Sequence, residues 1–143
     1  MNPRRWRLAA VLVMSAALVV FLGACGHAGY AAGATPDIAK AAQAAGADVI
    51  VSGRAENRYP GGTGATWYQV DRAGAGGGVL VGVLTFDSVA ARDAAYRQVQ
   101  FRANRLPPTV VYTWRDAVVQ ISQIDSWGLL QDLATAMEAA GAK

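Results

Sequence analysis

The chain has 143 residues, of which 53% are hydrophobic and 16% are charged. It holds 13 Lys and Arg against 10 Asp and Glu, but Arg4, Arg5 and Arg7 account for the excess, so the chain beyond them lacks the basic bias of nucleic-acid-binding proteins. A single Cys and a single His exclude an intrachain disulfide and leave too few residue types for a usual zinc site or a His-dependent triad.

The first 24 residues have the composition of a secretory signal. A basic start at Arg4, Arg5 and Arg7 is followed by an uncharged, apolar run over residues 8–24. This run is short for a transmembrane helix, which needs about 20 apolar residues. We therefore predict a signal peptide at residues 1–24. The general export route ranks first, and the adjacent Arg4 and Arg5 leave the twin-arginine route open as the second. The alternative is an uncleaved signal anchor.

The apolar run ends in a short motif around the only cysteine. The residues Leu22-Gly23-Ala24-Cys25 resemble the lipobox of bacterial lipoprotein precursors. The resemblance implies transfer of a diacylglycerol with palmitate-type chains to the Cys25 thiol, cleavage between Ala24 and Cys25, and room for a further acyl chain on the new amino terminus. Two or three such chains hold a protein stably on a bilayer, because each buried methylene adds about 0.8 kcal/mol. The predicted location is the extracytoplasmic side of the cell membrane.

A tether and one domain are predicted after the signal. Residues 25–34 are mostly Gly and Ala, and their only ionisable side chains are those of Cys25, His27 and Tyr30. This composition is typical of a flexible linker. A histidine in such a tether is not held beside a nucleophile, so we expect no His-assisted catalysis. Residues 35–143 have the length of a single domain.

Three helices are predicted in this domain from caps and apolar periodicity. The first has Thr35 as its cap and Pro36 as its first residue. The second is capped by Asp87 or Ser88, and the third begins near Ser126. Each of the last two has an apolar stripe at helical spacing. The stripes are Ala95, Tyr96, Val99, Ala103 and Leu106 in the second helix, and Leu129, Leu130, Leu133, Met137 and Ala140 in the third.

Strands are predicted between the helices from β-branched and aromatic residues. Residues 65–71 and 79–86 flank a glycine-rich hairpin loop, residues 109–114 and 117–124 flank a tight turn, and residues 48–51 add an edge strand. The order is then α-β-β-β-α-β-β-α. It predicts an α+β fold, with a mostly antiparallel sheet of four to five strands and the three helices packed on one face.

This order, together with the phrase FDSVAARDA at residues 86–94, resembles small uncharacterised lipoproteins of actinobacteria. That group has no established activity to carry over. The resemblance therefore implies an envelope location and this type of domain, and nothing about chemistry.

Candidate contact residues lie on the second predicted helix and on two strands. Arg97, Phe101 and Arg105 recur at four-residue spacing opposite the apolar stripe, a pattern that suits anionic headgroups or a partner protein. The alternative is a solvated face with one stray aromatic. Trp67 and Trp114 are able to stack on a sugar or a partner, although alternation along a strand favours packing of such residues under helices.

The leading interpretation of function is a non-enzymatic binding module of the cell envelope, with a partner protein or a wall component as its target. The alternative is a carboxylate-dependent hydrolase of cell-wall glycan or peptide, which needs two acids held about 5 to 9 Å apart. Caps, turns and solvated helix faces explain most of the acids instead. The glycine-rich segments 73–78 and 59–64 are interpreted as a hairpin loop and a surface turn. No cofactor, metal or nucleic-acid partner is expected.

Overall fold

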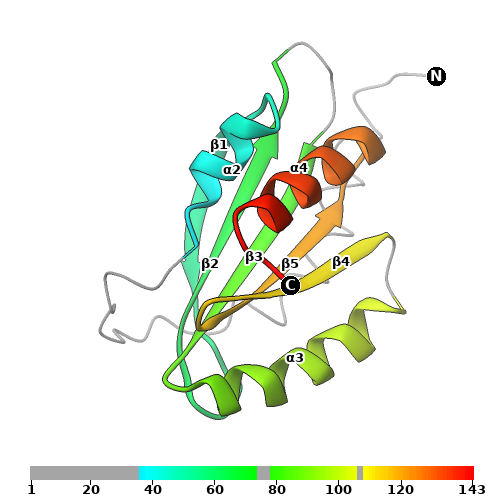
Figure 1. Ribbon diagram of the computed structural model, residues 1–143. Helices are drawn as coiled ribbons and strands as arrows, with labels where there is room; N and C mark the ends of the chain where they lie inside the picture. The colour runs from blue at the N-terminus through cyan, green and yellow to red at the C-terminus, as the bar shows by residue number, and fades with distance from the viewer. Residues whose placement is uncertain (1–35, 74–77, 106–107) are drawn as a thin grey trace, which may run out of the picture.

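A computed structural model describes residues 36–73, 78–105 and 108–143. Over these ranges the chain forms three helices and five strands in the order α-β-β-β-α-β-β-α, which confirms the predicted α+β fold (Figure 1). The signal, the tether, the Thr35 cap and Leu106 lie outside the described residues.

The five strands form one antiparallel sheet in the order β1-β2-β3-β5-β4. Hairpins join β1 to β2, β2 to β3 and β4 to β5, whereas helix α3 carries the chain from β3 across to the far edge. Strand β3 is therefore central, as its continuous apolar run predicts. The strands are β1 (Asp48–Ala55), β2 (Gly62–Asp71), β3 (Gly78–Phe86), β4 (Thr109–Trp114) and β5 (Ala117–Gln123).

Polar side chains begin all three helices, α2 (Ile38–Ala44), α3 (Val89–Ala103) and α4 (Trp127–Ala139). Ser88 and Ser126 cap α3 and α4, each by accepting a backbone N–H bond. The first cap differs from the prediction. Asp37 accepts from the Lys40 N–H at 3.0 Å, so Pro36 precedes the cap and is not a helical residue.

Four of the five residues predicted on the α4 stripe are buried, and Ala140 is exposed. The reason is that the helix ends at Ala139 and Ala140 is its C-cap. Gly141 then adopts a φ of 102°, a left-handed conformation that glycine permits after a helix. The buried four are Leu129, Leu130, Leu133 and Met137.

The helices cover both faces of the sheet, so the prediction that they pack on one face was wrong. Neighbouring residues of β5 belong to different apolar clusters: Val119 packs with α2 and α4, whereas Val118 packs with α3. Both are 0% exposed. Figure 1 shows α3 set apart from α2 and α4. The physical reason is that β3 is apolar on both sides, and Val118 of β5 adds to its apolar surface on the α3 side, so both faces need cover.

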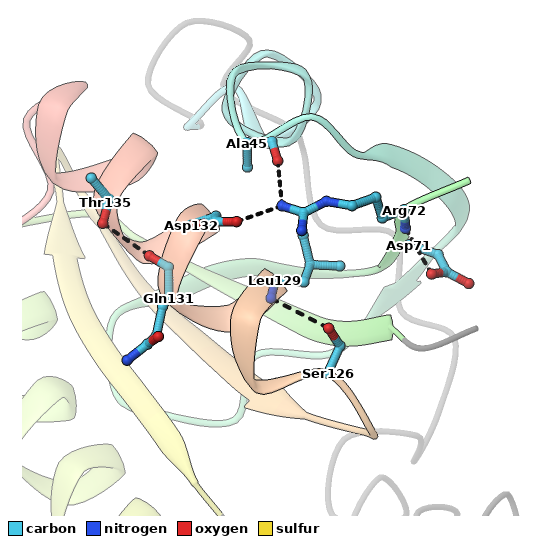
Figure 2. A network of polar contacts seen from close by, with 8 residues as sticks. All are labelled: Ala45, Asp71, Arg72, Ser126, Leu129, Gln131, Asp132 and Thr135. Atoms are coloured by element: carbon cyan, nitrogen blue, oxygen red, sulfur yellow. Dashed lines mark hydrogen bonds and ion pairs between the residues drawn. The ribbon is translucent and has the colours of Figure 1, made fainter. Parts of the chain in front are cut away.

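Arg72, which follows β2, links two helices on the α2 and α4 side of the sheet (Figure 2). Its Nη2 donates to the Ala45 carbonyl oxygen at 2.7 Å and to Asp132 Oδ2 at 2.6 Å. The ion pair is partly exposed and is worth at most about 1 kcal/mol. The bond to Ala45 satisfies a carbonyl at the end of α2, and so fixes α2 against α4.

Tyr112 of β4 is buried, and its hydroxyl donates to Glu138 Oε1 of α4 at 2.8 Å. Burial raises the pKa of the Tyr112 hydroxyl above its ordinary value, and the hydrogen bond to Glu138 and the charge of that carboxylate raise it further. The folded protein therefore holds this proton more firmly than the unfolded chain does.

We expect this contact to make stability fall in alkaline solution. A raised folded-state pKa contributes stability that is complete below about pH 10, the unfolded value, and is lost as pH rises toward the folded value. Urea unfolding at a series of pH values from 8 to 11 should show a steeper decline above about pH 10 for the parent protein than for Tyr112→Phe. Tyr96→Phe on α3 is the matched control and should keep the parent slope. Equal slopes for the parent and Tyr112→Phe would contradict the assignment.

The cover on both faces predicts that consecutive residues of β5 are equally sensitive to truncation. Val118→Ala and Val119→Ala should each lower the free energy of unfolding by about 1.5 to 3 kcal/mol, because each removes two buried methyl groups and leaves a cavity. Val51→Ala in β1, where the side chain is exposed, should change it by less than about 0.5 kcal/mol. A near-neutral Val118→Ala would show that the α3 layer contributes no cover.

Candidate functional site

The candidate site is the outer side of α3. The helical repeat determines which side chains lie on that side. The residues that α3 buries against the sheet recur every four positions, and the residues two positions after each of them point the opposite way, because two residues turn a helix by about 200°. The buried set is Ala95, Val99 and Ala103. The outward set is Arg97, Phe101 and Arg105, and all three are exposed.

The three outward residues form one continuous surface. The guanidinium carbon of Arg105 lies 4.6 Å from the centre of the Phe101 ring, which is a cation–π contact. Phe101 is 60% exposed, more than any other large hydrophobic side chain of the described ranges. Arg97 lies one turn earlier on the same side. The structure thus brings together the three residues that the sequence pattern selected.

A shallow, open hollow runs along this side of the helix. Its lining comes from the helix and the residues just after it, so no second element supplies an opposite wall. Sites for small molecules are enclosed by several elements and bury most of the ligand, which this hollow does not do. We call its lining residues the α3 surface: Ala94, Arg97, Gln98, Phe101, Arg102 and Arg105.

Arg102 belongs to the α3 surface, although it was not among the predicted contact residues. Its Nη1 donates to the Tyr59 hydroxyl at 3.3 Å, and its guanidinium carbon lies 5.8 Å from the centre of that ring. It therefore connects α3 to the loop between β1 and β2. The sequence signal that would have found it is the spacing of three residues between Arg102 and Arg105, which places neighbours on one helix face.

The loop that carries Tyr59 is held in place. The surface-turn interpretation of residues 59–64 was wrong for residues 62–64, which pair with β3 as the start of β2. The Asn57 side-chain amide donates to the Thr85 carbonyl oxygen at 2.7 Å, and the Asp87 N–H donates to the Gly61 carbonyl oxygen at 2.9 Å. Gly61 has a φ of 74°, a conformation that side chains other than glycine rarely adopt. The loop thus fixes the start of α3 against the end of β3.

A further arginine of α3 is occupied by contacts within the protein. Arg92 pairs with Asp93 Oδ1 at 2.7 Å, and its Nη1 donates to the carbonyl oxygen of Arg115 in the turn between β4 and β5. Its side chain is also mostly buried. The outward positive charge of the α3 surface therefore comes from Arg97, Arg102 and Arg105.

The two tryptophans predicted as additional contact residues lie elsewhere. Trp114 is 5% exposed and packs in the core beneath α2 and α4, so its prediction as a contact residue was wrong. The reason is that Tyr112 and Trp114 alternate onto the same covered face of β4. Trp67 of β2 is half-buried against Gly53 of β1. A Cβ atom at position 53 would lie 2.5 Å from the Trp67 indole nitrogen, so the contact requires glycine there. Neither tryptophan lines the α3 surface.

Many of the carboxylates have structural partners. Asp125 accepts from the Gly78 N–H at 2.6 Å, Asp37 caps α2, and Glu138 accepts from the Tyr112 hydroxyl. Ion pairs join three further acids to arginines: Glu56 to Arg58, Asp93 to Arg92 and Asp132 to Arg72. Asp116 differs, because its Oδ1 is buried without a hydrogen-bond partner in the described part of the chain. Over the same residues no cluster of three His, Cys, Asp or Glu side chains is arranged to hold a metal. The hydrolase alternative stays a prediction.

Comparisons of the chain with protein-family models, with curated proteins and with solved structures find no match. Among the helices of the described ranges, none has the length and hydropathy of a membrane-crossing segment. A proposal about function therefore depends on the α3 surface and on the residues around Cys25.

Proposed function

We propose that this protein is a lipid-anchored component of the cell envelope that acts as a non-enzymatic interaction module through its α3 surface. The observation that carries the proposal is the arrangement of Arg97, Phe101 and Arg105, an exposed aromatic ring between two exposed arginines. Aromatic and arginine side chains are enriched among the residues that dominate binding energy in interfaces.

Energetics support a binding role for Phe101. Full burial of a phenylalanine side chain contributes about 1.5 to 3 kcal/mol relative to exposure, and most of this contribution is not realised within the fold. A partner that covers the ring recovers it. The Arg105 guanidinium above the ring adds a cation–π contact that becomes stronger when water is removed.

The anchor is proposed from the lipobox at Leu22 to Cys25. Acylated Cys25 would be joined to the domain by residues 26–34, a span of at most about 35 Å when fully extended. Such a link holds the α3 surface close to the bilayer and raises its effective concentration toward anything located there. A weak surface is then sufficient for stable contact.

The anchor is tested by intact-mass analysis of protein isolated from its native membrane. We expect a chain that begins at Cys25 and carries two or three acyl groups, because the residues before Cys25 resemble a lipobox. Cys25→Ser should lose the acyl mass and accumulate with residues 1–24 uncleaved, whereas a serine substitution at an unrelated small residue, Ala34→Ser, should change neither property. A native chain with residue 1 present, or with an unmodified thiol at residue 25, would contradict the proposal.

The contact surface is tested by photo-crosslinking in intact cells. A photoreactive residue in place of Gln98, on the α3 surface, should yield adducts with an envelope component, while the same residue in place of Gln131, exposed on α4, should yield far fewer. Arg97→Ala combined with Phe101→Ala should lower the Gln98 adducts by about tenfold or more, because both side chains are in the contact.

Two controls make this experiment decisive. The double variant should keep the parent free energy of unfolding within about 1 kcal/mol, since both side chains are exposed and belong to no apolar cluster. Lys40→Ala on α2, a charge removed from the opposite side of the sheet, should leave the adducts unchanged. Equal adduct yields at positions 98 and 131 would reject the α3 surface as the contact.

A further inference from the structure

We infer that the α3 surface binds the anionic headgroups of the phospholipid bilayer to which the chain is anchored. The inference rests on the proposed function and specifies the partner of the same surface. Three observations carry it: the distribution of charge between the two helical layers, the chemistry around Phe101, and the open shape of the hollow along α3.

Charge is divided between the two sides of the sheet. Residues 89–105, which hold α3 and the two residues after it, carry four arginines and one aspartate, a formal charge of +3. Helices α2 and α4 carry Lys40, Asp132 and Glu138, and Arg72 lies on the same side, where it pairs with Asp132, so the formal charge there is 0. A negative bilayer surface therefore attracts the α3 side more strongly, and orients the domain with α3 toward the lipid.

The side chains of the α3 surface suit the boundary between headgroups and acyl chains. Arginine presents a planar set of N–H donors that matches the oxygens of a phosphate. The Arg105 guanidinium lies over the Phe101 ring, and Arg97 lines the same surface one turn earlier, so two groups suited to phosphate accompany one apolar ring. Helices that lie on membranes place basic residues at the phosphates and Phe, Trp or Leu below them, on opposite faces of the helix. The α3 surface offers both kinds of side chain on one side, because the other side of α3 is buried against the sheet.

The shape of the surface favours a bilayer over a globular partner. A stable protein interface buries about 800 Å² on each side and has an apolar centre, usually with several anchors. The α3 surface comes from one helix and has one exposed large apolar side chain, Phe101, surrounded by Arg97, Gln98, Arg102 and Arg105. A bilayer presents a flat array of phosphates, so binding to it needs no enclosing pocket on the protein. Several headgroups contact several arginines at the same time.

The strength expected of this contact is modest. Each basic residue near an anionic surface contributes a factor of about five to the binding constant, so three arginines contribute about a hundredfold. Alone this is weak. A lipid anchor at Cys25 makes the contact intramolecular, and the same factor then decides which side of the domain faces the bilayer.

The test measures which side of the anchored full chain contacts lipid. The chain is reconstituted into vesicles of phosphatidylcholine alone or mixed with phosphatidylglycerol, and a fluorophore is attached at Gln98→Cys on α3 or at Gln131→Cys on α4. Cys25 is the only native cysteine, so each variant offers one added site. Quenching of the fluorophore by brominated lipid reports contact with the bilayer.

We expect strong quenching at position 98 and weak quenching at position 131 in vesicles that contain phosphatidylglycerol. The difference should disappear in pure phosphatidylcholine and in about 1 M salt, where the Debye length is about 3 Å. Arg97→Gln combined with Arg105→Gln should lower the equilibrium constant for the docked orientation by about 25-fold. Lys40→Gln, on the other side of the sheet, is the matched control and should not lower it. Urea unfolding of each variant confirms that it is folded.

The contrary outcomes separate this inference from the proposed function. Equal quenching at positions 98 and 131, no quenching at either, or quenching at 98 that does not depend on phosphatidylglycerol would overturn headgroup binding. If adducts from position 98 in cells then contain a protein or a wall fragment, the α3 surface remains an interaction site with another partner. If position 98 yields no adducts and no lipid contact, both proposals fail.

Discussion

Burial of the central strands on both faces is the constraint from which the rest of the fold follows. Strand β3 has apolar side chains on both sides, and β5 adds Val119 and Ile121 to one side and Val118 to the other, so water on either side would expose apolar side chains. Each buried valine contributes about 1.5 kcal/mol or more relative to exposure, so both faces require a helical layer. Helices α2 and α4 form one layer, and α3 alone forms the other.

The unequal division of helices explains where an interaction surface arises. On the first side, α2 and α4 contact each other, and Arg72 and Tyr112 make polar contacts to α4, so those side chains are used within the fold. On the second side, α3 has no neighbouring helix in the described part of the chain. Its buried stripe is narrow, with Ala95 and Val99 at its centre, and on its opposite side Arg102 contacts Tyr59 of the loop between β1 and β2. That side is free to carry arginines and an exposed Phe101.

The element order and the three central site residues were predictable from sequence because they depend on local patterns. Serine caps, glycine-rich connections and apolar spacing act over a few residues, and so does the four-residue spacing of Arg97, Phe101 and Arg105. The errors concern contacts between distant segments. Which face α3 covers, and which face Trp114 occupies, depend on the crossover that places β5 between β3 and β4. The part played by Arg102 likewise depends on Tyr59, 43 residues away in the chain.

Net charge illustrates how a fold changes the meaning of a composition. Beyond the first seven residues the basic and acidic side chains balance, and an average over the chain indicates no preference for a charged partner. The sheet distributes these charges unevenly, since the α3 segment is positively charged, whereas Lys40 and Arg72 balance the acids of α4 on the other side. Attraction to a surface falls off within a Debye length of about 8 Å in physiological salt, so the near side of a domain contributes most of it. A chain whose charges balance beyond its first seven residues therefore still presents a positive side when a basic helix forms an outer layer by itself, as α3 does.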